Sequence, residues 1–399
     1  MCKIKKRYDI LTVYTDSKYS YHYKNRVGKH TMDIYEISFF SRFKCLEGSC
    51  PETCCRGWMI PLTNEDRDRY RREGGTLKVA TALAVSRRDI VCFNSGSGEC
   101  PFHNKAGLCR LQLRKGHDFI PEACRMYPRF YRNYREFEEH YVDLSCIGAS
   151  RLFLENADRL DLIFSSGEPL SGACTTNDDL PFLDALRILR SVMLKRLADV
   201  DDFDCLIKAL GDIVSYASKT QKAYLEGDTG FLTAYPFDSH RNTETPKDDI
   251  FPLSFKVIDA IMDTSFYNIR LKKTNPTLHH LCGLYFDTIA SFKDAAAKWD
   301  DMAHDLMAEH KEAAKYLAAY YAYYLYLYYL KCYEDYSFTR NVRIGIIHTG
   351  MIFLLSALHK SEKSSLTADD LARIIAVYNR RAYFNDEILD EMYRCLDPL

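Results

Sequence analysis

Nine of the fifteen cysteines of this 399-residue chain lie within about a hundred residues. Thiols at this density are typical of a disulfide scaffold or a metal site. The N-terminal segment has no continuous apolar stretch followed by a cleavage site, so it predicts no signal peptide and a cytoplasmic location. Clustered cysteines in a reducing cytosol more often bind metal or catalyse than form disulfides. The sequence therefore predicts a metal site.

The spacing of the cysteines selects eight candidate ligands. Side chains three or four residues apart can turn onto one ion, whereas adjacent side chains usually diverge, so one of Cys54 and Cys55 is expected to serve another site. Cys92 lies in an apolar run and is interpreted as a strand or core residue. The eight thiols furnish two four-ligand sites, or one site with structural thiols left over; they are Cys45, Cys50, Cys54, Cys55, Cys100, Cys109, Cys124 and Cys146.

The pattern favours an iron–sulfur cluster, with a 4Fe-4S cluster the preferred type, because such clusters accept loosely spaced thiolates. Structural zinc is the first alternative, but it most often uses a C-x2-C pair, which this region lacks. Plain buried or redox-active thiols are the second alternative. His103 stands three residues after Cys100, a workable spacing for a ligand, although a hydrogen-bonding surface role is commoner. The six cysteines outside the region are expected to be small buried hydrophobic residues.

Arginines alternate with aromatic residues after Cys124, in RMYPRFYRNYR. Such a mixture can bind nucleic acid by stacking bases and pairing phosphates. The formal net charge of −1 argues against that use. We favour arginines that neutralise a negatively charged cluster from nearby.

The sequence predicts a mainly α fold with three parts. Residues 1–31 are expected to be an extension, residues 32–155 an irregular cysteine-rich domain with short strands, and residues 156–399 a helical domain. Residues 34–44 alternate as in a strand, and residues 58–60 continue an extended stretch. Thr63 and Asp66 have the spacing of a capping box, and Gly74-Gly75 is a stop signal for the helix that follows the box.

The second half is periodic in the way of amphipathic helices. Leu186, Leu189, Met193 and Leu197 recur at intervals of three and four residues. Residues 316–330 carry no charge and eight tyrosines. They are too few to span a bilayer, so we predict a buried helix and no membrane segment. Tyr316, Tyr320, Tyr324 and Tyr328 share one face, which favours core packing over a channel for a lysine side chain.

Four motifs resemble the flagellin lysine-N-methylases, and more broadly the zinc- or iron-chelating domains named for a CxxCxxCC-type cluster. These motifs are FKCLEGSCPETCCRGW at 43–58, CPF with a later LCR at 100–110, CRMYPR at 124–129 and LSC at 144–146. The family's usual proline after the last cysteine is here replaced by Ile147-Gly148-Ala149. The first unit is also not the C-x3-C-x2-C of radical S-adenosylmethionine enzymes, so radical chemistry is unsupported.

The resemblance implies a protein-lysine N-methyltransferase that moves methyl groups from S-adenosylmethionine to flagellin and carries an iron–sulfur cluster. No glycine-rich turn of the usual donor-binding fold is present, so neither catalytic nor donor-binding residues are assigned. Two other functions remain open. One is a metal-binding interaction or redox-sensing protein without turnover, and the other is a zinc-stabilised nucleic-acid binder.

Overall fold

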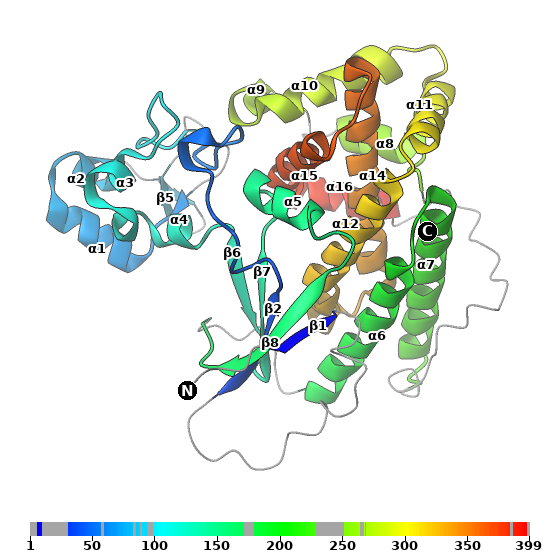
Figure 1. The fold of residues 1–399 in the computed structure, drawn as a ribbon, viewed down its shortest axis with the longest axis horizontal. Coiled ribbons are helices and arrows are strands. Elements are labelled where there is room, and N and C mark those ends of the chain that lie inside the picture. The colour runs from blue at the N-terminus through cyan, green and yellow to red at the C-terminus, as the bar shows by residue number, and fades with distance from the viewer. Residues whose placement is uncertain are drawn as a thin grey trace.

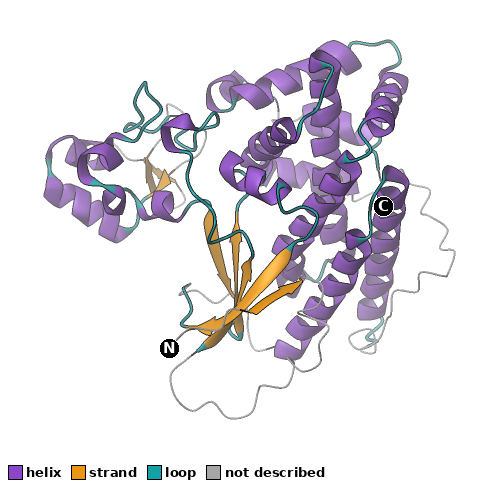
Figure 2. Ribbon diagram, viewed as in Figure 1, coloured by secondary structure: helices purple, strands orange, loops and turns teal. Residues whose placement is uncertain are grey.

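The computed structural model describes residues 6–9, 31–56, 60–82, 85–87, 90–93, 99–170, 179–228, 251–263, 267, 269–383 and 386–396. In these ranges the strands all lie before residue 168, and helices make up nearly everything that follows (Figure 2). A sheet connects a small lobe on one side to a large helical body on the other (Figure 1). The predicted mainly α fold with short strands in its N-terminal part is confirmed.

A mixed five-stranded sheet has the order β1-β8-β2-β7-β6. Strands β2 and β7 run parallel, and the other neighbours run antiparallel. The strands are β1 (Lys6–Asp9), β2 (Met32–Ile37), β6 (Arg129–Asn133), β7 (Phe137–Val142) and β8 (Asp161–Gly167). The sheet thus takes β1 from the expected N-terminal extension and β8 from beyond the boundary expected at residue 155.

Strand β2 is shorter than the sequence predicts. It ends at Ile37, where the Phe40 amide donates to the Ile37 carbonyl over 2.9 Å and the Arg42 amide donates to the Phe39 carbonyl over 3.2 Å. These turns bury Phe39 and Phe40, which are 0% and 6% exposed. The strand prediction for residues 38–44 was wrong because aromatic residues buried by turns imitate the alternation of a strand.

The lobe comprises the described residues between 55 and 126 and has its own small core. Its elements are β3 (Ile60–Pro61), α1 (Asn64–Glu73), α2 (Gly75–Ala82), β4 (Val85–Arg87), β5 (Ile90–Phe93), α3 (Arg110–Lys115) and α4 (Glu122–Met126). The predicted capping box is present, since the Thr63 hydroxyl accepts from the Asp66 amide and the Asp66 carboxylate accepts from the Thr63 amide. Helix α1 ends at Gly74, whose φ of 78° favours glycine. Trp58 and Met59 of the expected extended stretch lie outside the described residues.

The helical body packs around one continuous core that also includes the sheet. The four residues predicted to share a face between 186 and 197 are buried in it. Its helices are α5 (Ile147–Leu154), α6 (Leu180–Ala198), α7 (Phe203–Leu225), α8 (Phe255–Ile261), α9 (Ile269–Thr274), α10 (Pro276–Tyr285), α11 (Ala295–Glu309), α12 (Ala313–Tyr328), α13 (Cys332–Asp335), α14 (Phe338–Lys363), α15 (Ala368–Ala382) and α16 (Asp386–Leu396).

Helix α14 is the central helix of this body. It is long and apolar enough to cross a membrane, with a mean hydropathy of 1.5, but 89% of that stretch is buried by the rest of the chain. Helix α12, the tyrosine-rich helix, packs against it and is buried as predicted. The Tyr323 hydroxyl donates to the Val142 carbonyl over 2.8 Å and thereby ties α12 to β7.

A buried ion pair makes a second tie between sheet and body. The Arg190 guanidinium of α6 pairs with the Glu139 carboxylate of β7 and donates to the Tyr326 carbonyl over 2.6 Å. Arg190 and Glu139 are 0% and 2% exposed. Their charges compensate each other inside the core, and a buried charge persists only with such a partner.

Candidate functional site

Four of the eight candidate thiols meet within the lobe. Cys100 belongs to the core of the lobe, and Cys55, Cys109 and Cys124 pack against that core. The Cys100 amide donates to the Cys55 carbonyl over 2.8 Å. A β-bridge between His103 and Cys109 brings the latter back beside Cys100. We call Cys55, Cys100, Cys109 and Cys124 the lobe thiols.

The other four lie where the lobe joins the helical body. The Arg380 guanidinium of α15 donates to the carbonyls of Glu52, Thr53 and Ser145 over 2.9, 3.2 and 3.1 Å. These contacts hold the segments that end in Cys54 and Cys146 side by side.

Cys45 and Cys50 complete this second group. A turn in which the Cys50 amide donates to the Glu47 carbonyl over 3.1 Å brings the two cysteines together. At Gly148 a Cβ atom would lie 3.6 Å from Leu46 Cγ and 3.8 Å from Cys146 Sγ, so the residue after Cys45 lies close to Cys146. We call Cys45, Cys50, Cys54 and Cys146 the junction thiols.

The electrostatics of the thiols follow the same division. Burial raises the pKa of Cys124, and the nearby Cys100, Cys55 and Cys109 raise it further. Burial also raises the pKa of Cys146 to about 12, and Cys50 and Cys45 add to the increase. Neighbouring thiols raise each other's pKa because two negative charges repel in a buried site, and a bound cation would relieve that repulsion.

The adjacent cysteines differ from each other. A hydrogen bond between the two side chains lowers the pKa of Cys55 to about 7 and raises the pKa of Cys54 well above its ordinary value. A thiolate is the form that binds metal. Cys54 also interacts with both Cys124 and Cys146, so this pair lies between the two groups.

The spacing of the sulfur atoms bears on the kind of metal site. Across the described part of the chain, no three of these eight sulfurs lie within 4.8 Å of one another. Four thiolates about 2.3 Å from a zinc ion would lie about 3.8 Å apart. In a 4Fe-4S cluster each thiolate binds a different iron, so its sulfurs are more widely spaced. The described sulfurs are therefore not gathered as closely as one zinc ion requires.

The remaining predictions near the thiols have mixed outcomes. Cys92 lies in β5 and is 3% exposed, as predicted. His103 Nε2 is buried and, among the described residues, has no hydrogen-bond partner. Arg129 donates to the Phe43 carbonyl over 2.8 Å, two residues before Cys45, but Arg132 turns toward α12 and bonds the Leu327 carbonyl. The arginine that holds the junction segments is Arg380, which sequence reasoning missed.

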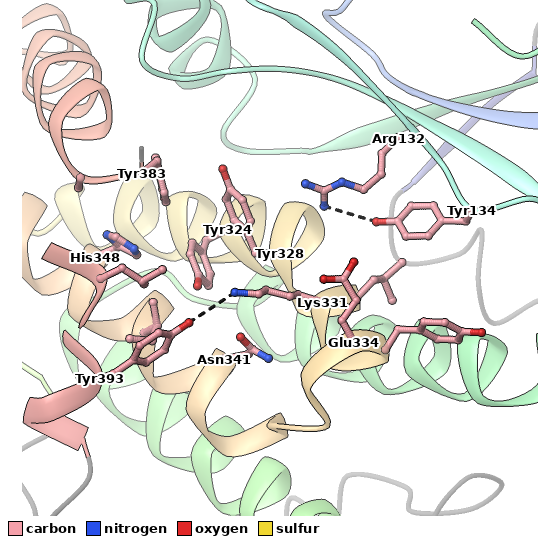
Figure 3. A pocket seen from close by; sticks show the side chains of 15 residues that line it. Arg132, Tyr134, Tyr324, Tyr328, Lys331, Glu334, Asn341, His348, Tyr383 and Tyr393 are labelled. Atoms are coloured by element: carbon pink, nitrogen blue, oxygen red, sulfur yellow. Dashed lines mark hydrogen bonds between the residues drawn. The ribbon is translucent and has the colours of Figure 1, made fainter. Parts of the chain in front are cut away.

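A pocket of about 350 Å³ lies in the helical body, where α12, α13, α14 and α16 meet the end of β6 (Figure 3). Tyr324 and Tyr328 of α12 line it, with ring centroids 5.1 Å apart. Tyr383, which follows α15, stacks on Tyr328 at 5.2 Å. Three aromatic rings therefore form one wall of the pocket.

Charged groups face the same space. Lys331 reaches into it with its amine 3.5 Å from the Tyr393 hydroxyl, and the Glu334 carboxylate and the Arg132 guanidinium also line it (Figure 3). Burial raises the pKa of Tyr324 and Tyr328 well above the ordinary value, so both phenols stay neutral. The pocket thus combines neutral aromatic faces with two cations and one carboxylate.

Two further features concern the pocket. Burial lowers the pKa of His348, another lining residue, to about 3, so this imidazole is a neutral and weak base. Of the tyrosines that share one face of α12, for which we favoured core packing over a lysine channel, Tyr324 and Tyr328 line the pocket. Tyr320 does not, and its hydroxyl instead bonds the Asn379 side chain over 2.7 Å.

Residues 188–397 match the model of the FliB lysine N-methylase C-terminal domain, which covers more than half of the chain. Most of the helical body, with nearly all of the pocket lining, lies within this match. The match makes this chain a member of the FliB lysine N-methylase family.

The similar proteins are distant from this chain. The flagellar biosynthetic protein FliU of Salmonella muenchen is 24% identical over 141 residues, which cover 32% of this chain and 81% of that protein. The lysine-N-methylase of Salmonella typhimurium is 24% identical over 141 residues, and that of Salmonella choleraesuis is 23% identical. The alignment covers only 34% of each lysine-N-methylase. No solved structure matches the chain.

Proposed function

We propose that this chain transfers methyl groups from S-adenosylmethionine to lysine side chains of flagellin in the cytoplasm, and that it carries an iron–sulfur cluster on its thiols. Membership of the lysine N-methylase family supports the reaction. The observation that carries the proposal is the pocket of α12, α13, α14 and α16, which combines neutral aromatic faces with cationic and anionic side chains.

The lining suits the methyl donor. S-adenosylmethionine supplies an electrophilic methyl group on a positively charged sulfur, and aromatic faces attract cations. Its methionine end carries both a carboxylate and an ammonium group. We propose that the Lys331 amine binds the carboxylate and that the Glu334 carboxylate binds the ammonium, since both residues line the pocket. A volume of about 350 Å³ is within the range of small-molecule sites.

Lys331 and Arg132 also act on the lysine amine that accepts the methyl group. A lysine amine attacks a methyl group only when it has lost its proton. The positive charges of Lys331 and Arg132 lower the pKa of a third amine in the pocket, because like charges repel at short range. The phenols of Tyr324 and Tyr328 form the buried wall of the pocket, whereas Lys331 and Glu334 are exposed at its opening.

The thiols do not line this pocket, so the displacement itself uses no cysteine. An iron–sulfur cluster supplies electron storage and a rigid cross-link. The position of the thiols also favours the second candidate, a metal-binding interaction or redox-sensing protein. The two candidates differ in whether the loaded protein transfers methyl groups.

The test is donor binding and methyl transfer by the anaerobically purified, iron-loaded protein. Lys331→Met is expected to weaken binding of S-adenosylmethionine about 10- to 100-fold, since it removes one charge-assisted hydrogen bond. Lys315→Met is the matched control, because Lys315 lies on α12 and pairs with Asp158 outside the pocket. Equal donor affinity in both variants would overturn the assignment of the pocket. Absence of labelled methyl transfer to flagellin by loaded wild-type protein would favour the second candidate.

A further inference from the structure

The eight thiols form two groups that are held by different parts of the fold. The lobe thiols all contact the small core of Ile60, Tyr70, Phe93 and their neighbours. Of the junction thiols, Cys146 packs against the main core. Four ligands are the number that one 4Fe-4S cluster needs, and each group supplies four.

The chain direction explains why adjacent cysteines are divided. The Cys55 carbonyl accepts the amide of Cys100, which commits Cys55 to the lobe. The carbonyls of Glu52 and Thr53, just before Cys54, accept hydrogen bonds from Arg380 of α15. These bonds attach the segment that leads into Cys54 to the helical body. A hydrogen bond still joins the two side chains, so the pair lies at the boundary between the two groups.

The surroundings of the junction thiols suit a negatively charged cofactor. Cys146 is the N-cap of α5, so the backbone amides of the first helical turn point toward its end of the helix. The Arg380 guanidinium donates to the carbonyls of Thr53 and Ser145, just before Cys54 and Cys146, and so lies beside these two cysteines. Backbone amides and a guanidinium stabilise thiolates.

We infer that the chain holds two iron–sulfur clusters, one on Cys55, Cys100, Cys109 and Cys124 and the other on Cys45, Cys50, Cys54 and Cys146. The inference rests on the proposed function only for the type of cofactor. Its stoichiometry and ligand sets do not depend on methyl transfer.

Iron and acid-labile sulfide analysis of anaerobically purified protein tests this division. Wild-type protein is expected to carry about eight irons per chain. The lobe variant Cys100→Ala/Cys109→Ala and the junction variant Cys50→Ala/Cys146→Ala are each expected to lose half of the iron. The control Cys205→Ala/Cys395→Ala removes two thiols elsewhere and is expected to keep all of it.

Electron paramagnetic resonance of the reduced protein gives a second measurement that does not depend on yield. Two clusters joined through adjacent ligands are expected to broaden each other's signals, and either double variant should leave one sharp signal. Loss of all iron in one double variant with none lost in the other would show a single cluster. Stoichiometric zinc in place of iron would also overturn the inference.

Discussion

The substitution Gly345→Ala is expected to narrow the pocket, because the added methyl group displaces the Tyr324 ring that lines it. Gly345 lies on α14 against the tyrosines of α12. A Cβ atom there would lie 2.4 Å from Tyr324 Cδ1 and 2.7 Å from Tyr321 Cε2. Carbon atoms in good contact are about 3.5–4.0 Å apart, so the Tyr324 ring must move by about 1 Å.

In Gly345→Ala the expected loss of stability is small, whereas the expected loss of activity is large. Overpacking costs about 1–3 kcal/mol, and the better helix propensity of alanine returns about 1 kcal/mol. The free energy of unfolding should therefore fall by at most about 2 kcal/mol. A displacement of about 1 Å in a reacting group can reduce the rate about 100-fold, so methyl transfer should fall far more than stability.

Gly350→Ala is the matched control on the same helix. Its Cβ would lie 2.3 Å from Leu253 Cγ, a similar clash with a side chain that does not line the pocket. Thermal unfolding should change similarly in the two variants, while donor binding by calorimetry and labelled methyl transfer should fall only in Gly345→Ala. Equal activity per folded molecule in the two variants would refute the reasoning that places the reaction in this pocket.

Three further predictions concern charge. Burial lowers the pKa of His348 from 6.5 to about 3, so unfolding takes up a proton between these values and stability falls by about 1.4 kcal/mol per pH unit below pH 6.5. His348→Asn should flatten that slope in urea titrations at pH 7 and pH 5, and an unchanged slope would contradict the assignment. Arg190→Ala leaves the Glu139 carboxylate buried without its partner and should lower the free energy of unfolding by about 3–5 kcal/mol. The double variant Arg190→Met/Glu139→Leu should unfold near the wild-type midpoint. Equal losses of stability in the two variants would argue against a charge effect. Arg380→Met should speed the loss of iron to a chelator without changing helix content, and wild-type release rates would show that Arg380 does not hold the junction.

Local signals in the sequence predicted local structure well. The Thr63 capping box, the burial of the tyrosine helix and the place of Cys92 in a strand all depend on residues a few positions apart. The family resemblance, carried by cysteine motifs in residues 43–146, agrees with a family match that covers residues 188–397. The cysteine motifs and the helical body therefore point to the same family independently.

Tertiary contacts decided the rest. The division of the thiols depends on Arg380, which lies 235 residues after Ser145, and no local pattern links them. The pocket takes Lys331, Glu334, His348 and Tyr393 from separate helical segments. Each of these looks ordinary in the sequence, and only the packing of α12, α14 and α16 brings them to one cavity.

The position of the lobe between β2 and β6 has a consequence for maturation of the protein. Pairing of β2 with β7 is delayed during synthesis, because the whole lobe lies between the two strands in the chain. Among the described residues of the lobe, nine are buried in its core. A domain as small as this lobe usually needs a cross-link to stay folded. Insertion of the proposed cluster would therefore control when the lobe, and with it the pairing of β2 and β7, becomes stable. Exposure to air would leave a protein that keeps its helical circular dichroism but has become open to proteases within the lobe.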